Sequence, residues 1–222
     1  MKIRSIVPIL AGTLLVAGGC KNMNKAQKGV LIGAGAGGAA GAVIGKAAGN
    51  TALGAIIGAA AGGVAGGIIG RKMDKQAEEI AQIPGAEVKR VGEGINVTFD
   101  SGVLFGHDRD DLTPDARKKL SDLADILNKY PDTYVLVEGH TDATGTDTYN
   151  MDLSRRRAST VATYLKTEDI KSQRIITKWY GEDQPKYSND SESDRAKNRR
   201  VEFAIYANEK MVNDAKKEAG GK

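Results

Sequence analysis

Arg157 lies on the apolar face of a predicted helix, the face that we expect to be buried. The spacing of apolar residues predicts a helix over 153–166, and Leu153 and Val161 each lie four residues from Arg157, on the same face. A cation on that face is costly to bury unless an anion meets it. We therefore expect either an internal carboxylate or an anionic ligand to contact Arg157.

The nearest candidate for a partner charge is Asp142, in the segment GHTD over 139–142. This segment follows a predicted strand over 134–138, and the loops at strand ends commonly carry binding groups. An aspartate accepts hydrogen bonds from an ammonium group, and an arginine clamps a carboxylate with two parallel hydrogen bonds. The pair would therefore suit a ligand with an ammonium and a carboxylate on one carbon. The residues alone equally allow a structural salt bridge between Asp142 and Arg157, without a ligand.

No other constellation predicts catalysis, a metal or a cofactor. His140 lies two residues before Asp142, but no serine is placed as the nucleophile of a Ser-His-Asp triad. The acidic run over 107–111 lacks the glycine and the distal glutamate of an EF-hand, so we expect a solvated loop there. One cysteine and two histidines cannot build a Cys/His zinc site. We therefore expect a protein that is not an enzyme and needs no cofactor.

The elements that would position these residues form one domain over 87–207. Helical spacing predicts two helices, the first of which begins at Thr113-Pro114 with the threonine as its N-cap. The order strand, strand, helix, strand, helix, strand, strand predicts an α+β fold with helices packed on one sheet. We expect 71–86 to be a linker of helical tendency and 208–222 to be a disordered tail. The expected strands cover 88–91, 95–99, 134–138, 175–180 and 201–206.

Several motifs in this domain resemble the C-terminal domain of OmpA-like proteins, a family that includes Pal and the periplasmic part of MotB. They are, in chain order, VEGHTDATGTDTYNMDLSRRRASTVATYL, YGEDQP and NRRVEF. The resemblance implies a βαβαββ domain with a mixed sheet, which binds peptidoglycan non-covalently through the diaminopimelate of the stem peptide. Where the family has a Gly-Tyr/Phe-Gly motif, this chain has Trp179-Tyr180-Gly181.

The resemblance also implies which residues bind the diaminopimelate group. The aspartate of the GHTD motif matches Asp142, and the arginine of the LSxxRA motif matches Arg157. In the family these two residues hold the ammonium and carboxylate ends of the ligand. Thr141 and Asn150 would line the same site, and Arg199 would be a further basic residue of the pocket.

The first 28 residues have the pattern of an export signal followed by a lipid anchor. Basic residues precede an apolar run over 6–16, and small residues lead to Cys20. The pattern resembles a lipobox, so we expect a lipoprotein signal peptide over 1–19 and a lipidated tether over 20–28, held at a membrane by acyl chains such as palmitate on Cys20. By resemblance to lipoprotein sorting in Gram-negative bacteria, Lys21 favours the outer membrane, with the folded domain in the periplasm. An ordinary signal peptide with a coincidental cysteine is the alternative.

A segment rich in glycine and alanine covers residues 29–70. Of its 42 residues 15 are glycine and 13 are alanine, and two series of glycines recur at every fourth position. That spacing places each series on one stripe of a helix, where glycines let helices pack closely in lipid. We expect a helical hairpin over 29–49 and 52–70, which resembles the glycine zippers of some outer-membrane lipoproteins; a flexible spacer is the alternative. The second helix, over 52–70, is near the lower length limit for a membrane span, so the sequence allows both a spanning and a non-spanning hairpin.

The charge distribution argues against one class of partner. Residues 1–70 carry six basic and no acidic side chains, so 71–222 carry 26 basic and 28 acidic ones, a net charge of −2. Nucleic-acid binding needs a basic surface, which this net charge does not provide, so we expect the chain not to bind nucleic acid. The sequence thus predicts an outer-membrane lipoprotein that anchors the envelope to peptidoglycan. The alternative is a membrane-associated assembly protein whose glycine hairpin forms homo-oligomers.

Overall fold

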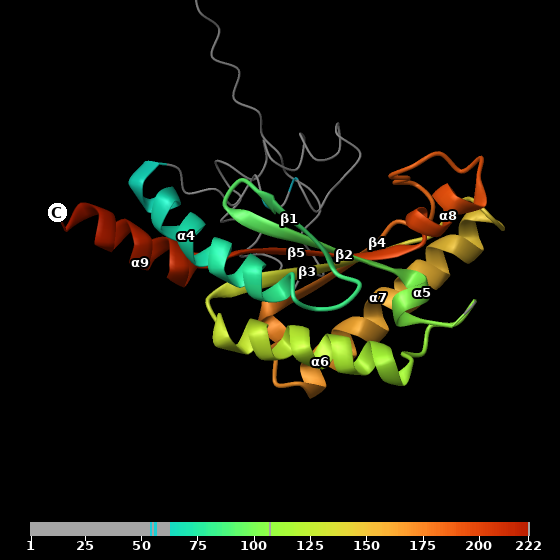
Figure 1. The fold of residues 1–222 in the computed structure, drawn as a ribbon, viewed down its shortest axis with the longest axis horizontal. Coiled ribbons are helices and arrows are strands. Elements are labelled where there is room, and N and C mark those ends of the chain that lie inside the picture. The colour runs from blue at the N-terminus through green and yellow to red at the C-terminus, as the bar shows by residue number, and fades with distance from the viewer. Residues whose placement is uncertain (1–53, 55, 57–62, 107, 222) are drawn as a thin grey trace, which may run out of the picture.

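The computed structural model describes residues 54, 56, 63–106 and 108–221 (Figure 1). These residues form an α+β domain in which helices pack on a mixed five-stranded sheet, which confirms the expected fold class. Among the described residues, no helix is both long enough and apolar enough to cross a membrane. The predicted signal peptide, Cys20 and most of the predicted glycine hairpin lie outside the described residues.

The sheet has the strand order β1-β2-β5-β3-β4. The first four strands in this order pair antiparallel, and β4 lies parallel to β3 at the far edge. A parallel pair needs a crossover connection, which helix α7 supplies between β3 and β4. The last strand in the chain therefore lies at the centre of the sheet. The strands are β1 (Glu87–Val91), β2 (Gly94–Asp100), β3 (Thr133–His140), β4 (Ile175–Trp179) and β5 (Arg200–Ala207).

The two main helices begin where a threonine side chain caps them. Helix α6 (Pro114–Lys129) is capped by Thr113, whose hydroxyl accepts a hydrogen bond from the amide of Ala116 at 3.1 Å, as the sequence predicted. Helix α7 (Asp147–Thr167) begins earlier than residue 153, because Thr146 caps it by accepting from the amide of Tyr149 at 3.3 Å. The described chain also contains short helices that the sequence did not predict, namely α5 (Ser101–Leu104), a 3₁₀ turn (Ser172–Arg174) and α8 (Glu192–Asn198).

The main core lies between the sheet and helices α6 and α7, which Figure 1 shows on one side of the strands. Alternate residues of the central strands point into it, where they meet the buried leucines of α6 and the apolar face of α7. The opposite face of the sheet has two parts. One end carries a small apolar cluster, and the other end carries buried polar and charged side chains from β2, β3 and β5.

Two further helices extend this core beyond the predicted domain. Helices α4 (Gly63–Ile80) and α9 (Glu209–Gly220) lie side by side (Figure 1), and Met73, Met211 and Ala215 are buried between them and the sheet. The expectation of a disordered tail over 208–222 is therefore wrong, because burial against α4 stabilises a helix whose own apolar residues are few. The expected boundary between hairpin and linker at residue 70 also falls inside a continuous helix, α4.

Candidate functional site

Arg157 is buried, as its place on the apolar face of α7 predicted. Only 4% of its surface is exposed. Its Nε donates a hydrogen bond to the carbonyl oxygen of Arg109 at 2.9 Å, and its guanidinium carbon lies 5.2 Å from the centroid of the Phe105 ring. Both contacts come from the segment that follows α5, so a loop distant in the sequence holds one side of the guanidinium group by a charge-assisted hydrogen bond and a cation–π contact.

The two outer nitrogens of the Arg157 guanidinium have no hydrogen-bond acceptor among the described residues. No Asp or Glu of the described residues forms an ion pair with Arg157. Burial lowers the pKa of Arg157; the charges of Asp108 and Asp110 oppose that shift, and Arg199 adds to it. A buried cation without a directly paired anion is unfavourable. The site is therefore electrostatically prepared for an anionic group.

Asp142 follows β3 and is also buried, but its partner is not Arg157. Its Oδ2 lies 2.5 Å from Nη1 of Arg199, and its Oδ1 accepts a hydrogen bond from the amide of Thr144 at 2.9 Å. Burial would raise the pKa of Asp142, but the hydrogen bonds from Arg199 and Thr144 outweigh it and hold the pKa below its usual range. The simple structural salt bridge between Asp142 and Arg157 is therefore absent, and Asp142 is ionised at neutral pH.

Arg199 reaches the site from the end of α8. Its Nη2 also binds Glu192 of that helix at 2.7 Å, so the guanidinium bridges two carboxylates. The loop before α8 is held by the buried Asn198, the last residue of that helix. Oδ1 of Asn198 accepts hydrogen bonds from the amides of Lys186 and Tyr187 at 2.9 Å each. The sequence-predicted basic residue thus joins Asp142, and a rigid loop positions it.

Thr141 precedes Asp142 in the loop after β3, and Asn150 lies near the start of α7. The amide of Thr141 donates to the carbonyl oxygen of Gly181 at 2.8 Å, and its buried hydroxyl has no hydrogen-bond partner among the described residues. Nδ2 of Asn150 donates to the carbonyl oxygen of Thr144 at 3.1 Å and to Oε2 of Glu182 at 2.5 Å. Asn150 therefore ties the loop after β3 to the turn after β4.

Two glycines allow these segments to approach closely. A Cβ on Gly139 would lie 2.2 Å from the carbonyl oxygen of Ser154, because the end of β3 packs directly on the backbone of α7. Gly181 has φ +51°, and a Cβ there would lie 3.0 Å from the amide nitrogen of Met151. The hydroxyl of Ser154 accepts a hydrogen bond from the amide of Gly181 at 2.9 Å. Together these contacts fix α7 against the loops that carry the site.

The acidic loop before α6 is largely exposed to solvent, as expected, and it also contacts the arginines of α7. Asp110 accepts a hydrogen bond from Nε of Arg156 at 2.9 Å, and Asp111 pairs with Arg109 at 2.6 Å. The loop therefore spans from α5 to the arginines of α7. Sequence reasoning also missed Phe105 and Tyr149, both of which influence Arg157. The signal was present as an acidic run that complements the Arg155–Arg157 run, but the contact is long-range.

His140 is part of the support beneath the site. Burial, and then the nearby charge of Arg200, lower the pKa of His140 to about 3, so it is neutral and its ring stacks on Tyr180 at 5.5 Å. Burial would raise the pKa of Glu202, but the charges of Arg200 and Lys186 outweigh it and lower that pKa to about 2. Nε of Arg200 lies 2.6 Å from Oε1 of Glu202. This layer lies under the loop that carries Arg199.

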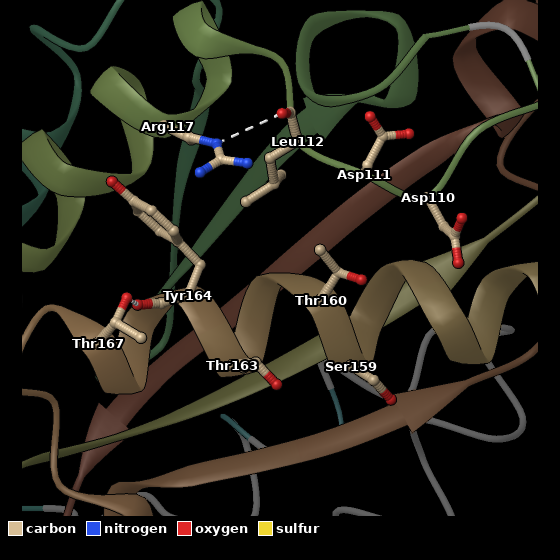
Figure 2. Close-up of a pocket in the computed structure, with 9 residues that line it drawn as sticks. All are labelled: Asp110, Asp111, Leu112, Arg117, Ser159, Thr160, Thr163, Tyr164 and Thr167. Atoms are coloured by element: carbon tan, nitrogen blue, oxygen red, sulfur yellow. Dashed lines mark hydrogen bonds between the residues drawn. The ribbon is translucent and has the colours of Figure 1, made fainter.

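A shallow groove of about 560 Å³ lies beside the site, along the outer face of α7 (Figure 2). Asp110 and Asp111 mark one end, Arg117 lies at the other, and threonine and serine hydroxyls of α7 line the floor. None of the five sequence-predicted site residues lines it. In the described part of the chain, no group of three or more His, Cys, Asp or Glu side chains could hold a metal ion.

Comparisons with known proteins agree with this architecture. The OmpA family model matches residues 104–199, which include all five predicted pocket residues, and a YMGG-like Gly-zipper model matches residues 1–74. The outer-membrane lipoprotein YfiB of Pseudomonas aeruginosa is 34% identical over 131 residues, which are 59% of this chain and 78% of that protein. The peptidoglycan-binding protein ArfA of Mycobacterium tuberculosis is 38% identical over 111 residues, which are 50% of this chain and 34% of that protein.

A solved structure shows the same fold. The cell wall anchor of the T6SS from Pseudomonas aeruginosa superposes with a TM-score of 0.55 at 27% identity, covering 61% of this chain and 96% of that chain. The chain spans only about a third of the length of other curated relatives, 36% and 34% in two cases. The match to YfiB nevertheless covers most of that relative. The chain belongs to the OmpA family.

Proposed function

We propose that the chain binds peptidoglycan non-covalently, through the diaminopimelate side chain of the stem peptide, and so anchors the outer membrane to the cell wall. The observation that carries this proposal is the buried Arg157 guanidinium, whose outer nitrogens have no acceptor among the described residues. The similarity to ArfA and to the T6SS cell wall anchor supports the ligand class. The function is binding, with no catalytic step.

Each charged end of the ligand has a partner of opposite charge. The ligand carboxylate accepts two parallel hydrogen bonds from the outer nitrogens of Arg157. The ligand ammonium donates to Asp142, which stays ionised because its pKa is held low. Arg199 adds positive charge beside Asp142 and strengthens the attraction for the carboxylate. A lysine side chain has the ammonium but lacks the carboxylate, so it would leave Arg157 unpaired.

Thr141 and Asn150 complete the pocket. The buried hydroxyl of Thr141 has no hydrogen-bond partner among the described residues, so a ligand polar group that reaches it would satisfy it. Asn150 holds the loop over 141–146 in place through its two hydrogen bonds. Holding the binding groups before the ligand arrives lowers the entropy lost on association.

The membrane end of the proposal rests on the first 74 residues. Acyl chains on Cys20, after removal of residues 1–19, would hold the tether over 20–28 in the outer membrane, with the domain over 87–207 in the periplasm. The similarity to the outer-membrane lipoprotein YfiB supports this placement. The chain would then link two layers of the envelope.

The direct test is retention of the purified chain on isolated cell-wall sacculi. Arg157→Met and Asp142→Asn should each remove retention on diaminopimelate-type sacculi, whereas Lys166→Met, an exposed cation on the same helix, should be retained like the wild type. Sacculi with lysine in place of diaminopimelate should retain none of the proteins. Equal retention of Arg157→Met and wild type would remove Arg157 from the site.

A second function is favoured by one specific observation, the match of residues 1–74 to a YMGG-like Gly-zipper model. Glycine stripes let helices approach closely in lipid, so this segment would make homo-oligomers in the membrane. Chemical cross-linking of wild type and of a variant without residues 29–62 distinguishes the two roles. Loss of cross-linked oligomers in the deletion supports assembly through the zipper, and unchanged oligomers refute it.

A further inference from the structure

The single tryptophan of the chain lies on the surface, next to the proposed diaminopimelate site. Trp179 ends the edge strand β4, faces α7, and is 39% exposed. It borders a hollow of about 470 Å³ together with Asp147, Met151, Asp152 and Arg155 of α7. At this position, where the resemblance to OmpA-like proteins predicts a glycine, the chain has a large aromatic ring.

The hollow and the proposed pocket share a wall. Gly181 lies two residues after Trp179, and its backbone packs against the backbone of Asn150 and Met151. Asn150 belongs to the proposed pocket, whereas the next residue, Met151, lines the hollow. Met151 projects from α7 about 100° away from Asn150 around the helix axis, so a polymer seated in the pocket has to cross this turn of α7 to reach the hollow.

We propose that this hollow binds a sugar ring of the glycan strand to which the stem peptide is attached. The inference rests on the proposed function, and it adds a second contact to the same polymer. One face of a pyranose ring presents C–H groups, which pack on the flat apolar surface of an indole ring, while its hydroxyl and acetamido groups need polar partners at the rim. Asp147 offers a carboxylate there, and Arg155 and Asp152 offer a hydrogen-bonded ion pair with an N–O distance of 2.6 Å.

Other surfaces fit a sugar less well. The groove of Figure 2 has hydroxyl groups, but its aromatic side chain, Tyr164, is not among the exposed ones. Tyr187 is as exposed as Trp179, at 40%, but Lys197 lies over its ring, with Nζ 4.9 Å from the centroid. Among the described residues, the hollow at Trp179 combines an exposed aromatic ring with free space of ligand size.

The test compares two soluble ligands on the full chain by calorimetry. One is the diaminopimelate-containing tripeptide, and the other is the same tripeptide attached to its N-acetylglucosamine–N-acetylmuramic acid disaccharide. The wild type should bind the disaccharide form about five- to tenfold more tightly, as expected for one stacked aromatic contact. In Trp179→Leu, which keeps an apolar side chain beside Met151, the two ligands should bind equally, with the tripeptide affinity unchanged. Tyr187→Ala should behave like the wild type.

The lone tryptophan gives a second, direct signal. Because the chain has one tryptophan, its fluorescence reports Trp179 alone, and the disaccharide form should change it while the tripeptide should not. Equal affinity of both ligands for the wild type, with unchanged fluorescence, overturns the sugar site and leaves the peptide site standing. Fluorescence change with a chitin oligosaccharide, but no binding of the tripeptide, supports the sugar site and overturns the proposed peptide site. Absence of binding by every ligand overturns both.

Discussion

Arg157 and Arg174 are both buried arginines, yet their surroundings predict opposite roles. Arg174 donates four hydrogen bonds at 2.8–3.1 Å, to the carbonyl oxygens of Leu127, Tyr130 and Thr133 and to the hydroxyl of Thr133. Arg157 donates one, to the carbonyl oxygen of Arg109. We therefore expect Arg174→Met to damage stability, and Arg157→Met to damage ligand binding alone.

The expected magnitudes follow from these contacts. Arg174→Met leaves buried carbonyl groups without donors, each worth ~1–3 kcal/mol, so the free energy of unfolding should fall by about 3–5 kcal/mol. Arg157→Met loses one charge-assisted hydrogen bond of ~1.5–3 kcal/mol and a cation–π contact of ~0.5–2 kcal/mol. The substitution also removes an unpaired buried charge, whose burial costs several kcal/mol, and it adds a contact between the methionine sulfur and Phe105. The net change should lie within about 1 kcal/mol of the wild type.

Urea unfolding of the three proteins, followed by far-ultraviolet circular dichroism at pH 7, measures this difference. With a urea slope of about 1–3 kcal/mol per molar, Arg174→Met should unfold at a midpoint about 1 M or more below Arg157→Met. Equal destabilisation by the two substitutions would contradict the reasoning, because it would make Arg157 a structural residue like Arg174. A stable Arg157→Met that still binds sacculi would refute the binding role.

Three further outcomes follow from the support beneath the site. The pKa of Glu202 is lowered to about 2 in the folded chain, so its ionised carboxylate stabilises the fold above pH 4.5, and this stabilisation is lost as the pH falls toward 2. Over that range the free energy of unfolding of the wild type should fall by about 3 kcal/mol more than that of Glu202→Gln. The imidazole of His140 should stay neutral from pH 8 to 5, seen as constant NMR shifts; titration near 6.5 would contradict its burial. Gly139→Ala should cost about 3 kcal/mol because its Cβ meets helix backbone, whereas Gly70→Ala, with open space in α4, should gain up to about 1 kcal/mol in thermal or urea unfolding.

Local patterns carried much of the fold. Alternating apolar residues located all five strands to within a few residues, and the Thr113-Pro114 start of α6 was correct because capping is a local interaction. The spacing on α7 also showed that Arg157 points into the core. Periodicity and caps are encoded within one turn or one strand, so they can be seen without the tertiary structure.

What the sequence could not show depends on contacts between distant segments. Helix α9 has few apolar residues and is stabilised by burial of Met211 and Ala215 against distant segments, so its composition resembled a tail. The pairing of Asp142 with Arg199, 57 residues away, depends on the central place of β5 and on the loop before it. The acidic loop was expected to be solvated, because nothing local in it indicates that Arg109 and Asp110 meet α7.

The central claim is that Arg157 and Asp142 recognise a carboxylate and an ammonium group on one carbon. Calorimetric titration of the full chain with the diaminopimelate-containing stem tripeptide, and with the same tripeptide carrying lysine in place of diaminopimelate, tests it most directly. In both peptides the α-amino group of the third residue is acylated, so only the diaminopimelate tripeptide carries an ammonium and a carboxylate group on one carbon. The wild type should bind the diaminopimelate tripeptide saturably and far more tightly than the lysine tripeptide, and Arg157→Met should lose at least about 30-fold in affinity, as expected when one partner of a buried charge pair is removed. Equal binding of the two ligands by the wild type, or undiminished binding by Arg157→Met, would contradict the claim.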